Sequence, residues 1–140
     1  MGIRLLKIAA VYLVVGTTMG LAMGITQSFT LHPVHAHINL LGWASLALAG
    51  IIYVMFPAAG ETRLAHIHFW MHNIGLPVFM GGLALGLTGH EAFMPLVEVG
   101  ATVTWVGLVI FVVNVCLNVR RETGPAAGKS RGAQIGAMAK

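Results

Sequence analysis

Residues 93–119 read FMPLVEVGATVTWVGLVIFVVNVCLNV, an apolar run in which Glu98 is the only charged side chain. A helix needs about 20 consecutive apolar residues to cross a hydrocarbon core of roughly 30 Å, and this run is long enough to do so. The chain has three further stretches of the same kind, at residues 5–26, 33–56 and 63–87. The sequence therefore predicts an all-α fold, a bundle of four transmembrane helices within residues 1–119.

The composition of the whole chain agrees with a lipid environment. Of its 140 residues, 57% are hydrophobic and 9% are charged, and the mean hydropathy is +0.85. Water-soluble domains are far less apolar. The formal net charge is +4, but Lys and Arg lie at the ends of the apolar stretches, where they set orientation. We expect the lipid bilayer as a partner and no binding to nucleic acid.

The positive residues also predict which side of the membrane each connection faces. Arg4 and Lys7 precede the first helix, Arg63 lies between the second and third, and a basic cluster occupies residues 120–140. The other two connections carry no Lys or Arg. Because positive residues favour the cytoplasmic side, we expect both termini in the cytoplasm, with 120–140 as a flexible basic tail. The expected location is a bacterial inner membrane.

Seven histidines are the most unusual polar feature of this apolar chain. Ionisable side chains inside a bilayer are costly, and they usually face the bundle interior or a cavity. The predicted topology divides the histidines into two layers, so we expect the functional chemistry in one of them. The outer layer contains His32, His35, His37 and His90, and the inner layer contains His66, His68 and His72.

The outer layer combines a histidine with other polar groups at similar depth. His37 lies about four residues inside the second helix, which is roughly 6 Å below its end. Asn39 follows it, and Glu98 lies about a turn and a half into the fourth helix from the same side. Such a set could form a proton path, a divalent-metal site, or a metal-bound imidazole oriented by Asn39 or Glu98. His35 could equally lie in the wet interface.

The inner layer has a spacing that is typical of metal ligands. His68 and His72 are four residues apart, which can present two imidazoles to one metal from one helical face. His66 and His68 can also be simple interfacial residues. His72 lies roughly 12 Å inside the start of its helix, so it needs a polar partner.

Two segments together resemble a known family. Residues 35–43, HAHINLLGW, and residues 52–57, IYVMFP, resemble the second helix of the catalytic subunit of heme-copper oxidases and nitric oxide reductases. Residues 68–75, HFWMHNIG, are similar to the start of the next helix in that subunit. The resemblance covers the four predicted helices. The family's copper ligands belong to later helices that this chain does not have, so we expect no complete oxidase or reductase.

The resemblance implies a bound heme b whose axial ligand is His37, or His35 if the register differs by two. The second ligand is then His90, His72, a histidine of a neighbouring subunit, or none. His90 lies at the level of His37, whereas His72 approaches from the opposite side of the membrane, about 12 Å away along the helix axes.

Three functions remain open from the sequence. The first is a heme b protein for electron transfer or diatomic-gas binding. The second is a copper or other transition-metal module built on the outer histidines with Glu91 and Glu98. The third is a structural subunit of a larger respiratory complex. Gly16, Gly20 and Gly24 form a small-residue stripe that allows close packing, either within the chain or in a homo-oligomer.

Overall fold

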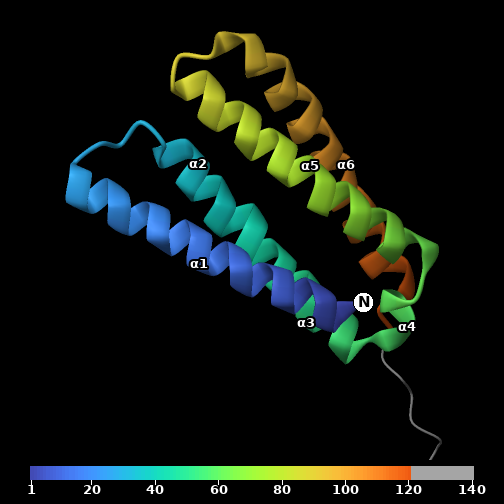
Figure 1. Cartoon of the computed structure of the whole chain (residues 1–140). Helices are drawn as coiled ribbons and strands as arrows, with labels where there is room; N and C mark the ends of the chain where they lie inside the picture. The colour runs from blue at the N-terminus through green and yellow to red at the C-terminus, as the bar shows by residue number, and fades with distance from the viewer. Residues whose placement is uncertain (121–140) are drawn as a thin grey trace, which may run out of the picture.

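The computed structural model describes residues 1–120, and helices form nearly all of that range. Two helical hairpins lie side by side: α1 pairs with α2, η1 and α3, and α5 pairs with α6 (Figure 1). No strand occurs in these residues, so the all-α prediction is confirmed. The elements are α1 (Gly2–Thr26), α2 (His32–His37), the π-helix η1 (Ile38–Ser45), α3 (Leu46–Met55), α4 (Pro57–Gly60), α5 (Arg63–Leu87), the 3₁₀ turn η2 (Glu91–Phe93) and α6 (Met94–Asn118).

Among residues 1–120, three helices are long and apolar enough to cross a membrane, where the sequence had suggested four. They are Gly2–Thr26, His32–Met55 and Glu91–Asn118. The exception is α5, which has the same length as α1 and α6 but carries three histidines, Arg63 and Asn73. These polar residues lower its hydropathy below that of its neighbours. The count of four apolar spans is therefore corrected to three.

Glycines bring α5 and α6 into close contact. A Cβ atom built at Gly100 would lie 2.6 Å from the Cα atom of Phe79 and 2.9 Å from the carbonyl oxygen of Gly75. A Cβ at Gly75 would in turn lie 2.7 Å from the Thr104 hydroxyl oxygen. Only glycine allows two helix backbones to approach this closely. The hairpin of α5 and α6 therefore depends on these small residues.

The second helix is continuous but not uniform, because residues 38–45 form a π-helix within it. Gly42 faces Tyr12 of α1, and a Cβ there would lie 2.6 Å from the tyrosine ring. From the other hairpin, His72 donates a hydrogen bond from Nε2 to the carbonyl oxygen of Leu41, at 3.0 Å. π-helical turns are rare and occur often at functional sites. This one ties α1, η1 and α5 together directly after His37.

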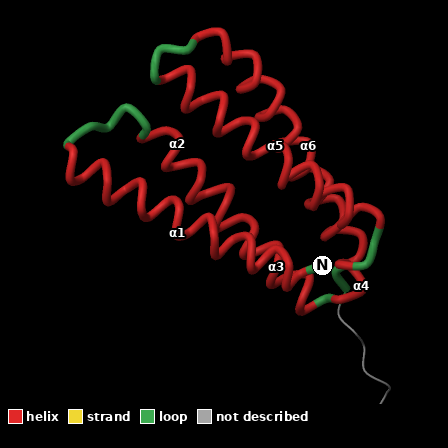
Figure 2. The backbone as a smooth tube through the Cα atoms, viewed as in Figure 1, coloured by secondary structure: helices red, strands yellow, loops and turns green. Residues whose placement is uncertain are grey.

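The helix ends follow ordinary capping rules. Pro33 and Pro57 stand in the first turns of α2 and α4, where a missing N–H costs nothing. Thr62 caps α5 by accepting a hydrogen bond from the Ala65 N–H at 3.0 Å. Gln27 ends α1 in the left-handed conformation, with φ of 53°. The tube of Figure 2 shows these short connections between long helices.

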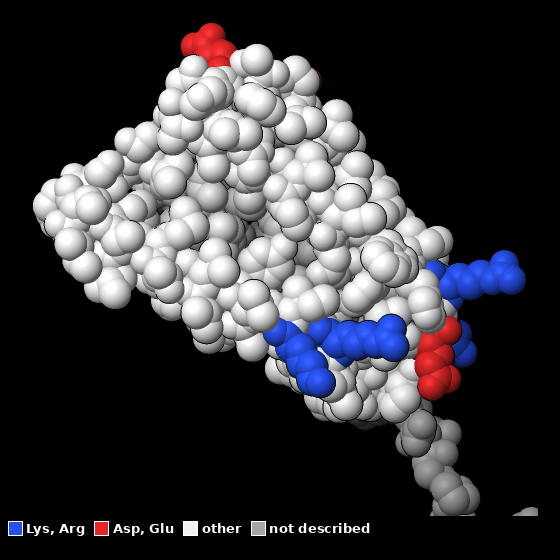
Figure 3. Space-filling model, viewed as in Figure 1, with Lys and Arg blue, Asp and Glu red and all other residues white. Residues whose placement is uncertain are grey.

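The described Lys and Arg side chains gather at one end of the bundle, together with Glu61 (Figure 3). The Lys and Arg side chains within residues 1–120 are Arg4, Lys7, Arg63 and Arg120, and they lie at the end that holds the N-terminus and α4 (Figures 1 and 3). The connections α1–α2 and α5–α6 lie at the other end and carry Glu91. Of the predicted basic tail at 120–140, all but Arg120 lies outside the described residues.

Candidate functional site

His35 and His37 share α2 but face different neighbours. The Nδ1 atom of His35 lies 2.8 Å from the carbonyl oxygen of Gly16 in α1, so Nδ1–H donates to it. The ring also lies directly over Gly20, where a Cβ would be 2.8 Å from its Cε1 atom. His35 is therefore enclosed within the first hairpin. Asn39, predicted as an orienting residue, contacts this histidine, since its amide donates to the His35 carbonyl oxygen at 2.9 Å.

His37 faces the second hairpin. Its Nδ1–H donates to the carbonyl oxygen of Pro33 one turn earlier, at 2.8 Å. Its half-buried ring meets Phe79 of α5 edge-on, with the ring centroids 5.2 Å apart. Because Nδ1 holds the proton, Nε2 of the neutral imidazole carries the free lone pair. His37 thus has the fixed tautomer that metal-binding histidines usually have.

The other predicted partners of His37 do not contact it. Glu98 lies two residues before Gly100 and so about 200° away from the face of α6 that packs on α5. It is exposed beside Val99, and no hydrogen bond within residues 1–120 joins it to His35 or His37. His90 is exposed in the α5–α6 connection, with its ring centroid 6.5 Å from that of Phe93. Glu98 is therefore not a hydrogen-bond partner of either histidine within the described residues.

The glycine stripe of α1 packs mainly inside the chain. Gly16 faces Asn39, Gly20 faces His35, and Gly24 has open space around it. We expect Gly20→Leu to lower the free energy of unfolding by roughly 1–3 kcal/mol, because the added side chain collides with a ring that is held by a hydrogen bond. Gly24→Leu is the matched control and should be tolerated. Thermal unfolding in detergent measures both, and equal stability of the two variants would contradict internal packing.

Two of the three inner histidines, His72 and His68, are deeply buried, which the sequence predicted for His72 but not for His68. Their side chains are 0% and 1% exposed, respectively. His66, in contrast, is exposed and bonds to the carbonyl oxygen of Thr62 at 2.9 Å. The His68 and His72 rings meet edge-on at 5.6 Å, and each directs a nitrogen to a different partner. His68 Nδ1 meets the Tyr53 hydroxyl at 3.4 Å, and His72 Nε2 meets Leu41.

A buried polar network, absent from the sequence-based prediction, surrounds His68. Asn114 of α6 is 0% exposed, and its Nδ2 group donates to the Tyr53 hydroxyl oxygen at 3.2 Å and to the Ala59 carbonyl oxygen at 2.9 Å. Its Oδ1 accepts from Thr62 at 2.8 Å. Since Tyr53 accepts from Asn114, its own O–H is directed to Nδ1 of His68. The network joins α3, α4, α5 and α6. Its sequence signal was Asn114, a polar side chain within the apolar helix α6.

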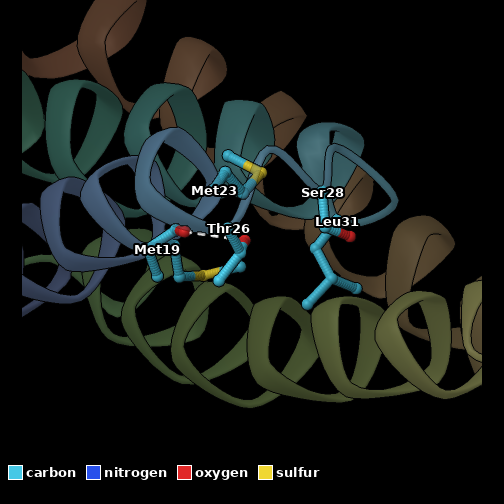
Figure 4. A pocket seen from close by; sticks show the side chains of 6 residues that line it. Met19, Met23, Thr26, Ser28 and Leu31 are labelled. Atoms are coloured by element: carbon cyan, nitrogen blue, oxygen red, sulfur yellow. Dashed lines mark hydrogen bonds between the residues drawn. The ribbon is translucent and has the colours of Figure 1, made fainter.

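The candidate ligands do not converge on one metal ion. Among residues 1–120, no three His, Cys, Asp or Glu side chains lie close enough together to hold one. A hollow of about 190 Å³ near the α1–α2 connection is lined by the side chains drawn in Figure 4, which are Met19, Ala22, Met23, Thr26, Ser28 and Leu31. No histidine lines that hollow. His35, His37 and His66 each bond a carbonyl oxygen through Nδ1, so each has a free Nε2 atom. What distinguishes His37 is the contact of its ring with Phe79 of the other hairpin.

Comparisons of the chain with protein families, with curated proteins and with solved structures found no match. Residues 1–120 form a helical protein with three apolar helices of membrane-spanning length and histidines near both ends of the helices.

Proposed function

We propose that this chain is an integral membrane protein that binds heme b through His37 and serves in electron transfer or diatomic-gas binding. The observation that carries the proposal is the side chain of His37. Its Nδ1–H is fixed on the Pro33 carbonyl oxygen, and its ring reaches Phe79 of the opposite hairpin. A carbonyl partner of this kind orients an imidazole and raises its basicity toward iron.

The number of ligands favours heme over copper. A heme iron is held by one or two protein side chains, since the porphyrin supplies the rest. Copper bound directly by the protein needs a convergent set, such as the two histidines and one cysteine of blue-copper sites. One oriented histidine per chain is enough for the first arrangement. When bound, heme b supplies an iron that exchanges one electron or binds a diatomic gas.

His37 is a better candidate for the axial ligand than His35. The Nδ1–H group of His35 donates to the Gly16 carbonyl oxygen, and its ring packs on Gly20, so both contacts lie within the first hairpin. His37 lies at the margin of the contact between α2 and α5, beside the core formed by Val34, Ile38, Leu76 and Met80. His90 lies at the same end of the bundle and is the candidate of this chain for the second axial position.

The membrane arrangement is part of the same proposal. In it α5 crosses the bilayer beside α6, because the two helices pack along each other and the hairpin cannot be divided. The basic end, with both termini, faces the cytoplasm, which follows the positive-inside rule. The membrane is a bacterial inner membrane, and the chain acts as a homo-oligomer or within a respiratory complex.

The visible absorption spectrum of the detergent-purified, full-length protein tests the heme assignment. We expect a Soret band and a pyridine hemochrome spectrum of heme b at about one heme per chain. Protein made without sufficient heme should gain the band when it is titrated with hemin. A folded protein that stays colourless and does not take up hemin contradicts the proposal, and stoichiometric copper in such a protein would favour the copper alternative.

A further inference from the structure

Two hollows occur side by side at the basic end of the bundle. One, of about 470 Å³, lies between the start of α1 and the end of α3 and is lined in part by Ile3, Arg4 and Val54. The other, of about 710 Å³, lies between the α3–α4 corner and the end of α6 and is lined in part by Met55 and Arg120. Val54 and Pro57 line both. Each hollow therefore combines apolar walls with one arginine.

The walls of these hollows remain open to the surroundings. Ile3, Val54 and Met55 are 64%, 48% and 66% exposed, although they are large apolar side chains. Arg4 and Arg120 are exposed as well, and Arg120 is anchored by a hydrogen bond from Nε to the Leu117 carbonyl oxygen at 3.3 Å. Among residues 1–120, no carboxylate lines either hollow. Both guanidinium groups can therefore accept an anionic partner.

In the proposed membrane arrangement, on which this step rests, the hollows lie at the boundary between hydrocarbon and headgroups. The long apolar helix His32–Met55 ends here, Pro57 turns the chain into α4, and the Lys and Arg residues of the described chain gather at this end (Figure 3). A ligand at this depth meets apolar side chains toward the membrane centre and guanidinium groups toward water. This is the chemistry of a phospholipid with a negatively charged headgroup.

We propose that this end of the protein is a binding site for an anionic phospholipid such as phosphatidylglycerol. The phosphate lies at Arg4 or Arg120, where a guanidinium group can bind two phosphate oxygens at once. The acyl chains lie against Ile3, Val54 and Met55. Of the three glutamates within residues 1–120, Glu61 lies at this end after α4 but lines neither hollow, and Glu91 lies at the opposite end of the bundle (Figure 3). The proposal does not depend on heme binding.

Native mass spectrometry of the full-length protein, titrated with phosphatidylglycerol or with phosphatidylcholine of the same acyl chains, tests this site. Arg4→Gln and Arg120→Gln should each weaken phosphatidylglycerol binding about five-fold, which corresponds to about 1 kcal/mol for each cationic side chain. Lys7→Gln and Arg63→Gln remove the same charge at the same end but outside both hollows. They should bind as the unaltered protein does.

The results below would overturn the proposal. Equal losses in all four variants would indicate attraction to the whole basic surface. Equal binding of the two lipids would remove the role of the arginines, and displacement of the lipid by excess inorganic phosphate would assign the site to a soluble anion.

The Val54→Trp variant adds an independent test, since it fills both hollows without a change in charge. We expect it to retain its helical circular dichroism and to lose phosphatidylglycerol binding; full binding would show that the hollows are not the site.

Discussion

His37→Ala is expected to abolish heme binding, whereas His35→Ala should retain most of the bound heme. Both histidines have a free Nε2 atom, but only the ring of His37 meets α5. Removal of His35 deletes a ring that packs on Gly20 and bonds to Gly16, both within the first hairpin. The Soret absorbance per folded chain, compared at equal yield, measures the difference.

His66→Ala is the matched control for this pair, because His66 is exposed and bonds only to its own helix. It should keep the full spectrum. A full, unshifted Soret band in His37→Ala together with its loss in His35→Ala would move the ligand by two residues. Unchanged spectra in both variants would remove the outer histidines from heme binding altogether.

The sequence alone does not decide whether His35 or His37 is the better candidate for the ligand. The two residues lie about 200° apart around a helix, so only one of them can face a given neighbour. The sequence contains no information about which neighbour lies on which side. The contact of His35 with α1 and that of His37 with α5 depend on how the hairpins pack, and this packing involves residues far apart in the chain.

The long helices, in contrast, could be predicted from local pattern. The apolar runs, the prolines at the starts of α2 and α4, and the polar connections define the helix boundaries to within a few residues. The predicted number of apolar spans was too high by one, because α5 has the length of a span but carries Arg63 and Asn73 in addition to its histidines. With 25 residues, α5 is long enough to cross a membrane, but its hydropathy is too low for it to count among the apolar spans.

Two features depend on tertiary contacts that the local sequence pattern does not reveal. The π-helix at 38–45 brings Gly42 against Tyr12 and is held by the bond from His72 to Leu41. The burial of His68 depends on the hydrogen-bonded chain that runs through Tyr53 and Asn114. A histidine next to an Arg-bearing helix start usually lies in the membrane interface. Here the partners that allow its burial come from other helices.

Gly100→Ala is expected to destabilise the protein strongly, although it adds only one methyl group. The new Cβ would lie 2.6 Å from the Cα atom of Phe79 and 2.9 Å from the Gly75 carbonyl oxygen. Both are backbone atoms, so no side-chain rotation can relieve the collision, and α5 and α6 must move apart. Overpacking of this kind costs roughly 3 kcal/mol or more.

Gly81→Ala is the matched control, because Gly81 also lies within a long helix of this hairpin but has nothing within 4 Å of its Cβ position. It should be neutral or slightly stabilising, since alanine favours a helix over glycine by about 1 kcal/mol. SDS-induced unfolding followed by circular dichroism measures both variants. Because the collision also displaces the backbone of Phe79, whose ring contacts His37, Gly100→Ala protein that still folds should show a shifted heme spectrum. Equal stability of the two variants would mean that α5 and α6 do not approach as closely as their glycines allow.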